Sequence, residues 1–172
     1  MLDTLTVQIA VISDTHLPRG NRRLPEDCVA RLKAADVIVH AGDLIRLSVL
    51  RELESYAPVI AVHGNVDDAQ VSEALPAVAS LETGGATIAV LHDAGPAKGR
   101  LGRMRRRFPE ADAVIFGHSH LPLHEEAQDG FQIFNPGSPT ERRRGGGRES
   151  QLSMGMASVE DGRLRFELIA VG

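Results

Sequence analysis

Short apolar runs that end in polar residues of metal-binding types recur along this chain, and they constrain its fold more than any other feature. The first run, Ile9–Ile12, is followed by Asp14 and His16. In an extended chain, residues two apart project from the same face, so we expect both side chains to point together beyond a strand end. A carboxylate and an imidazole side by side make half of a transition-metal site.

Four later apolar runs end in the same way, which turns a weak signal into an informative one. In three of them a glycine directly precedes the polar residue, and glycine permits a tight turn and close approach. Since ligands of open α/β sheets gather beyond the carboxyl ends of the strands, we expect these side chains to converge. In chain order the polar residues are Asp14 and His16, Asp43, Asn65, His92, and His118 and His120, and the glycines are Gly42, Gly64 and Gly117.

The order of the expected elements favours an α/β fold in one domain spanning 1–172. Helices alternate with buried strands first and hairpins follow, which suggests a mixed sheet, or two sheets packed together, with helices outside. The segment 140–150 is rich in Arg and Gly and reads as a mobile loop. Strands are expected at 7–12, 36–41, 58–62, 77–82, 87–91, 113–116, 123–128, 131–134, 152–159 and 164–169, and helices at 25–34, 47–56, 67–74 and 96–108.

Composition excludes several classes of partner. With a net charge of −4, the chain lacks the overall positive charge that is typical of nucleic-acid-binding proteins. Aromatic residues make up only 3%, so side chains on which bases could stack are few. No apolar run approaches the ~20 residues that span a bilayer. The single cysteine, Cys28, cannot form an intrachain disulfide, and the first residues lack a signal core. We expect a cytoplasmic protein without a membrane partner, with nucleic acid only as a substrate; a homo-oligomer is one option.

The polar residues at the strand ends are too numerous for one tetrahedral zinc ion. They suit two divalent ions that share a bridging carboxylate, at a separation of ~3.5–4 Å. Such a pair can hold and deprotonate a water and neutralise the charge of a phosphate. Oxygen and nitrogen ligands without thiolate suit Mn, Fe, Zn, Ni or Co, of which we expect Mn.

In this order the motifs resemble those of the calcineurin-like metallophosphoesterases. The short length and the turn Asn135-Pro136-Gly137-Ser138 resemble the small single-domain phosphodiesterase branch of that family. The resemblance runs from about Val7 to Ser138, and it implies a β-sandwich of two packed mixed sheets flanked by helices. The matching motifs are Asp14-x-His16, Gly42-Asp43, Gly64-Asn65, His92 and Gly117-His118-Ser119-His120.

The resemblance also implies a ligand set and a reaction. A metal-bridging hydroxide close to Asp43 would attack phosphorus in line, and Asn65 and one of the histidines, His92, would face the substrate. The chain would then be a metal-dependent phosphoric ester hydrolase that acts on a small phosphodiester. One ion would be held by Asp14, His16, Asp43 and His120, and the other by Asp43, Asn65, His92 and His118, with Asp43 bridging.

This sequence departs from the family pattern at two places. Many members carry a histidine directly after Gly-Asn that is thought to protonate the leaving group, and here Val66 takes its place. No general acid is therefore assigned, and esters with good leaving groups should be favoured. The segment around His92 usually reads Gly-His-Gly; here Asp93 follows, and it either orients His92 as an acceptor or starts the next turn.

Two other functions stay open at this stage. A retromer subunit resembles the family, has lost metal ligands and works by protein contacts, so the chain could be a binding scaffold. The filled ligand positions favour the enzyme over that scaffold. A phosphomonoester or nucleotide could also replace the diester as substrate.

The remaining side chains that could bind a ligand or react have simpler interpretations. Arg142, Arg143 or Arg148 could clamp a substrate phosphate, and we name Arg142 with Asn65 as substrate-binding. A solvated loop is an equal alternative for these arginines. His40 and His63 are expected to be buried structural residues, Cys28 to lie in the core, and His124 to lie on a strand surface.

Overall fold

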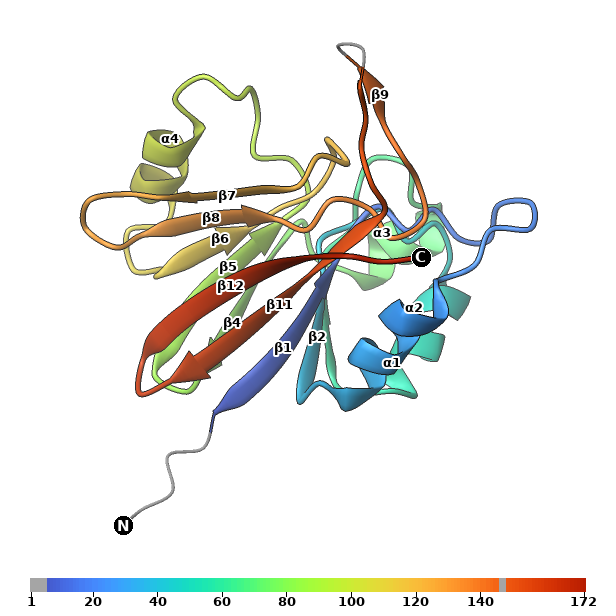
Figure 1. Cartoon of the computed structure of the whole chain (residues 1–172), viewed down its shortest axis with the longest axis horizontal. Coiled ribbons are helices and arrows are strands. Elements are labelled where there is room, and N and C mark those ends of the chain that lie inside the picture. The colour runs from blue at the N-terminus through green and yellow to red at the C-terminus, as the bar shows by residue number, and fades with distance from the viewer. Residues whose placement is uncertain (1–5, 146–147) are drawn as a thin grey trace.

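The computed structural model describes residues 6–145 and 148–172. As predicted, two mixed sheets pack face to face with helices on their outer sides (Figure 1). The first sheet has the order β12 (Arg163–Ala170), β11 (Ser153–Glu160), β1 (Val7–Ile12), β2 (Val37–His40), β3 (Val59–Ala61); the second has β4 (Val78–Thr83), β5 (Ala86–Leu91), β6 (Ala113–Ile115), β8 (Gln132–Asn135), β7 (Leu123–Glu126). Strands β1, β2 and β3 are parallel, as are β5, β6 and β8, and the other neighbours in each sheet pair antiparallel.

The apolar run of β1 is buried on both faces because successive side chains alternate across a strand. Ile9 and Val11 pack between the sheets, in the same cluster as Ile88 of β5. Ala10 and Ile12 face the helices on the other side of the first sheet. The central strand that carries Asp14 and His16 at its end is therefore held from two directions.

Within residues 6–145 and 148–172, four helices cover the outer faces of the sandwich (Figure 1). Cys28 of the first helix is fully buried against the first sheet, as predicted, and Met104 of the fourth packs against the second sheet. No helix in the described part of the chain is long and apolar enough to cross a membrane. The helices are α1 (Glu26–Ala34), α2 (Leu47–Glu54), α3 (Ala69–Ala74) and α4 (Arg100–Arg107).

Three local expectations need correction. Helix α4 begins at Arg100 rather than near residue 96, because Gly99 has a φ of +69° that an α-helix cannot contain. The predicted loop at 140–150 holds a short antiparallel pair, β9 (Arg144–Gly145) and β10 (Arg148–Glu149), and its predicted mobility falls partly on 146–147, outside the described residues. His63 is only half-buried, because it lies beyond the end of β3.

The expectations for the other two unassigned histidines are confirmed. His40, the last residue of β2, is fully buried, and its Nε2 lies 3.0 Å from the hydroxyl of Thr15. His124 is exposed on β7, at an edge of the second sheet. Both are structural residues of the sheets, and neither belongs to the cluster at the strand ends.

Candidate metal centre

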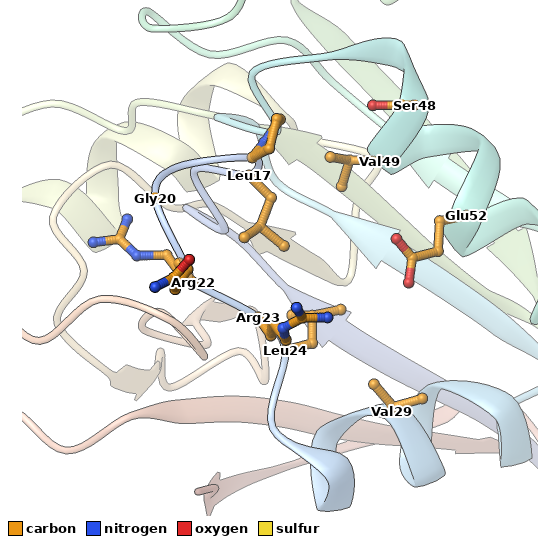
Figure 2. A pocket seen from close by; sticks show the side chains of 11 residues that line it. Leu17, Gly20, Arg22, Arg23, Leu24, Val29, Ser48, Val49 and Glu52 are labelled. Atoms are coloured by element: carbon orange, nitrogen blue, oxygen red, sulfur yellow. The ribbon is translucent and has the colours of Figure 1, made fainter.

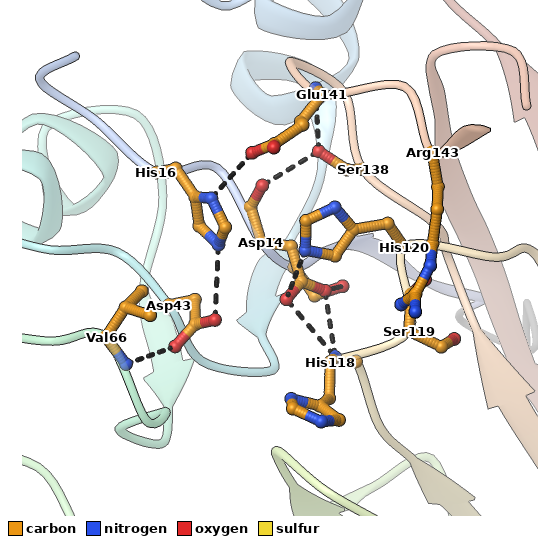
Figure 3. A network of polar contacts seen from close by, with 12 residues as sticks. Asp14, His16, Asp43, Val66, His118, Ser119, His120, Ser138, Glu141 and Arg143 are labelled. Atoms are coloured by element: carbon orange, nitrogen blue, oxygen red, sulfur yellow. Dashed lines mark hydrogen bonds and ion pairs between the residues drawn. The ribbon is translucent and has the colours of Figure 1, made fainter. Parts of the chain in front are cut away.

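The loops that follow β1, β2, β3, β5 and β6 meet at one edge of the sandwich. The backbone N–H of Asp14 donates to the carbonyl of Gly42 at 3.0 Å, which joins the first two loops. Gly117 donates to the carbonyl of His92 at 2.9 Å, which joins the loops of the second sheet. The carboxylate of Asp14 accepts the backbone N–H of His118 at 3.0 Å, so it links the two sheets (Figure 3).

The carboxylate of Asp43 lies at the centre of the cluster and is only 2% exposed. Its Oδ2 lies 3.2 Å from Nε2 of His16 and 3.2 Å from Nε2 of His92. Nε2 of His120 lies 3.4 Å from Oδ1 of Asp14 on the neighbouring side. Two groups have ligand atoms that all lie within 4.8 Å of one another: Asp14, His16 and His120, and Asp14, Asp43 and His92.

Asn65 and His118 complete the cluster at its solvent side. The side-chain oxygen of Asn65 lies 3.0 Å from Nε2 of His92 and 3.1 Å from Nδ1 of His118. Both Asn65 and His118 are exposed, whereas Asp14 and Asp43 are buried. The seven predicted residues therefore form one cluster with a buried carboxylate floor and an open mouth.

The spacing of these atoms fits divalent ions. Two ligands that each lie ~2.1 Å from one ion, at octahedral or tetrahedral angles, are about 3.0–3.4 Å apart. The contacts of Asp43 with His16 and His92, at 3.2 Å, fall in this range, as does the 3.4 Å contact of His120 with Asp14. Imidazole and carboxylate donors at this spacing can hold a metal.

The backbone at the site has an unusual conformation that the sequence did not predict. Asp14 and His16 have φ values of +55° and +47°, so they are not part of an extended strand as we expected. Asp43, His118 and His120 are also left-handed, with φ of +62°, +68° and +57°. Such a conformation costs a non-glycine residue about 1–3 kcal/mol, and it persists where the surroundings fix it, most often at functional sites.

The predicted role of the three motif glycines, to allow close approach, is confirmed. Each glycine packs against a cluster side chain that comes from a different loop. A methyl group on any of them would collide with that side chain, so no larger residue fits without movement. The nearest side-chain atoms belong to His92 for Gly42, to Asp43 for Gly64, and to Asp14 for Gly117.

Opposite charges shift the pKa values inside the cluster. Burial raises the pKa of Asp43, but hydrogen bonds from His16 and His92 outweigh it and hold that pKa far below its usual range. Burial lowers the pKa of His92, but its hydrogen bond to Asp43 and the charges of Asp14 and Asp43 raise it to about 9. The same balance raises the pKa of His16. The carboxylates thus hold positive charge at this edge, which a metal ion would supply in place of protons.

The orientation of His92 comes from a backbone carbonyl and not from its neighbour. Its Nδ1 lies 2.8 Å from the carbonyl of Ala41, so Nε2 points into the cluster. The side chain of Asp93 instead accepts the backbone N–H of Gly95 at 2.7 Å. Of the two roles left open for Asp93, the structure supports the start of the next turn.

Two carboxylates near the cluster are not identified by the sequence patterns. The sequence allows Asp67 or Asp68 to cap α3, and Asp68 does so by accepting the N–H of Val71 at 2.9 Å. Asp67 instead accepts backbone N–H groups of Asp43 (3.2 Å), Gly64 (2.6 Å) and Ile45, so it ties two site loops together. The second is Glu141, whose Oε2 lies 2.6 Å from Nδ1 of His16. An aspartate beside a glycine–asparagine pair was the available signal for Asp67.

The segment after β8 lies against the site. The hydroxyl of Ser138 donates to the carbonyl of Asp14 at 2.8 Å. Arg142 and Arg143 are both exposed, and Arg143 donates from Nη1 to the carbonyl of Ser119 at 2.9 Å, between the two histidines of the last motif (Figure 3). The side chain of Arg148 is outside the described residues.

Two pockets lie near these loops. One, of about 410 Å³, lies between the loop after β1 and helices α1 and α2, and Leu17, Arg22 and Val49 are among its lining residues (Figure 2). It contains none of the predicted ligands. The other, of about 310 Å³, is lined by Asn65 and His92 together with His63, Val78 and Arg107, among others. The second pocket therefore adjoins the cluster.

A cluster of carboxylates and imidazoles at the strand ends of a mixed sandwich is typical of metal-dependent hydrolases. The family model of the calcineurin-like phosphoesterase superfamily domain matches residues 7–162, and the chain belongs to that superfamily. A probable metallophosphoesterase of Methanothermobacter thermautotrophicus is 33% identical over 166 residues, covering 95% of this chain and 92% of the relative.

Two further proteins are similar to this chain. A phosphodiesterase of Methanocaldococcus jannaschii is 27% identical over 143 residues, covering 76% of this chain and 83% of the relative. The solved structure of Vacuolar Protein Sorting 29 from Cryptosporidium parvum superimposes with a TM-score of 0.78 at 18% identity, covering 95% of this chain and 97% of that one. At that identity the second similarity shows the shared fold alone.

Proposed function

We propose that this phosphoesterase is a phosphodiesterase with two divalent metal ions, of which Mn²⁺ is the expected one. The observation that carries the proposal is the central carboxylate of Asp43, whose Oδ2 lies 3.2 Å from Nε2 of both His16 and His92. A carboxylate between two imidazoles can bridge two ions. A relative that is named a phosphodiesterase supports the choice of a diester substrate.

Each ion would be bound by the ligands that lie on its own side of Asp43. Asp14, His16 and His120 would hold the first, because their ligand atoms lie within 4.8 Å of one another. Asn65, His92 and His118 would hold the second, because the oxygen of Asn65 lies 3.0 and 3.1 Å from the two imidazoles. When bound, the two ions supply a water of lowered pKa as nucleophile and positive charge for the phosphate oxygens.

The protein's own groups would orient the substrate and the nucleophile. The backbone N–H of Val66 donates to Oδ1 of Asp43 at 3.1 Å, which keeps Oδ2 turned toward the histidines. Asn65 and His118 are exposed at the mouth, so the diester phosphate would enter there. Arg143, or Arg142 beside it, would pair with a phosphate oxygen, because a guanidinium presents two parallel donors.

The pocket next to Asn65 and His92 leaves room for one substituent of the phosphate. The ester group of a phosphomonoester or either group of a diester would fit there, so the choice of a diester rests on the relative that is named a phosphodiesterase. Val66 offers no side-chain proton donor, and we therefore expect diesters with good leaving groups, such as aryl alcohols, to react fastest.

The competing function is a protein-binding scaffold, which the similarity in fold to Vacuolar Protein Sorting 29 raises. A scaffold does not need seven metal-competent side chains at contact distance of one another. The present cluster keeps all of them, and it places both carboxylates in the floor of the site. This favours the enzyme.

The direct test is hydrolysis of an aryl phosphodiester and an aryl phosphomonoester with added Mn²⁺, by the wild type and Asp43→Asn. We expect the wild type to prefer the diester and the variant to lose activity by at least about a hundredfold. Asp161→Asn, at the exposed turn between β11 and β12, is the matched control and should react like the wild type. Preference for the monoester would overturn the diester assignment, and full activity of Asp43→Asn would overturn the metal centre.

A further inference from the structure

The carboxylate of Glu141 contacts a predicted metal ligand from outside the motifs by which the sequence resembles the family. Its Oε2 lies 2.6 Å from Nδ1 of His16, and the His16 side chain is only 9% exposed. The opposite ring nitrogen, Nε2, faces Asp43 at 3.2 Å. The imidazole of His16 is therefore held between two carboxylates, one on each nitrogen (Figure 3).

Glu141 is fixed in place by the turn that precedes it. Its backbone N–H donates to the hydroxyl of Ser138 at 2.9 Å. The same hydroxyl donates to the carbonyl of Asp14, and Thr140 donates from its hydroxyl to the carbonyl of Thr15 at 2.7 Å. The turn is thus hydrogen-bonded to the loop that carries His16, which keeps the side chains of Glu141 and His16 next to each other.

Arg22 holds the carboxylate from the other side. Its Nη1 lies 3.1 Å from Oε2 of Glu141, the same oxygen that contacts His16. The Arg22 side chain is 22% exposed and that of Glu141 is 27% exposed, so the pair is shielded from much of the solvent. A guanidinium at this distance favours the ionised carboxylate, which is the strong acceptor form.

We propose that Glu141 is a positioning residue for the metal centre, which accepts the Nδ1 proton of His16 and so keeps Nε2 as the metal-binding atom. A neutral imidazole carries its proton on one nitrogen only, and a hydrogen bond at one nitrogen decides which. With the proton on Nδ1, the lone pair of Nε2 faces Asp43 and the interior of the cluster. The inference rests on the proposed metal centre and assigns Glu141 no contact with substrate.

Partners of this kind typically contribute 10–100-fold to metal affinity. Glu141→Ala should therefore weaken the affinity for one of the two Mn²⁺ ions by about 10–100-fold and leave the other nearly unchanged. Glu141→Gln keeps an acceptor oxygen and should recover part of the loss. Glu54→Ala, which removes an exposed glutamate of α2, is the matched control and should bind both ions like the wild type.

The experiment is titration of each metal-free protein with Mn²⁺ by isothermal calorimetry. It is paired with ¹⁵N NMR of the imidazole nitrogens of the Zn²⁺-loaded proteins. The wild type should show His16 with a hydrogen-bonded proton on Nδ1, and Glu141→Ala should lose the hydrogen-bonded shift.

The outcomes separate the two proposals. Two ions bound by the wild type and bound equally well by Glu141→Ala, with an unchanged His16 spectrum, would overturn the role of Glu141 alone. Failure of the wild type to bind Mn²⁺ or Zn²⁺ would overturn the metal centre and this inference with it. Selective weakening of one ion, with partial recovery in Glu141→Gln, is the result that supports the role.

Discussion

Replacing Gly64 by alanine should damage the candidate site without removing any of its ligands. A Cβ at this position would lie 2.6 Å from the backbone nitrogen of Asp43 and 2.8 Å from its Cγ, with Oδ1 closer still. Asp43 cannot retreat freely, because Val66 and Asp67 hold its carboxylate and its backbone. Overpacking of this kind costs about 1–3 kcal/mol. A loss near the middle of that range lowers the Tm of a chain of this size by about 4–8 °C.

The assay is thermal unfolding of the metal-free protein, followed by a count of bound Mn²⁺ per chain. Gly64→Ala should unfold at a lower temperature and also bind less Mn²⁺, since the methyl group displaces the central carboxylate. Gly102→Ala adds the same methyl group to the exposed face of α4, where it meets only the end of Arg106 at 3.3 Å. That control should be neutral or stabilised by up to about 1 kcal/mol. Wild-type Tm and metal content in Gly64→Ala would show that a methyl group at this position does not displace Asp43.

Three other variants test separate contacts. Asp67→Ala leaves three backbone N–H groups without their acceptor and should cost at least about 2 kcal/mol in urea unfolding, more than the loss of the α3 cap in Asp68→Ala; equal losses would contradict this. Arg143→Ala should raise the KM for an aryl diester several-fold and more than Arg142→Ala does, because Arg143 is held at Ser119 between the two histidines; a larger effect of Arg142→Ala would assign the phosphate to Arg142 instead. Burial lowers the pKa of His40 to about 3, below its unfolded value of about 6.5, so the unfolded state binds the extra proton between these pH values. The free energy of unfolding should therefore fall from pH 6.5 toward 4.5 more steeply in the wild type than in His40→Gln. The two slopes should differ by about 1.4 kcal/mol per pH unit. Parallel pH profiles would show that His40 does not titrate on unfolding.

Much of the fold follows from local patterns in the sequence. The β1 strand matches its predicted bounds of 7–12, because an apolar run of that length is buried on both faces of a central strand. The hairpin of β11 and β12 follows from Asp161-Gly162, a pair suited to the left-handed turn that both residues adopt. Convergence of the polar residues follows from the parallel order of the strands that precede them.

The parts that escaped prediction depend on contacts between distant segments. The left-handed backbone at Asp14 and His16 is imposed by the loop after β2, whose carbonyls accept their N–H groups, and nothing in the local sequence signals it. Glu141 lies in a stretch whose Arg and Gly content reads as solvated loop, and its contact with His16 depends on the tertiary position of the preceding turn. Sequence patterns identify the cluster itself, but not the groups that orient it.

The most direct test of a two-metal centre is anomalous diffraction from a crystal soaked in Mn²⁺. We expect two anomalous peaks that share the carboxylate of Asp43, one beside His16 and His120 and the other beside His92 and His118. A single peak, no peak, or ions that do not contact Asp43 would contradict it.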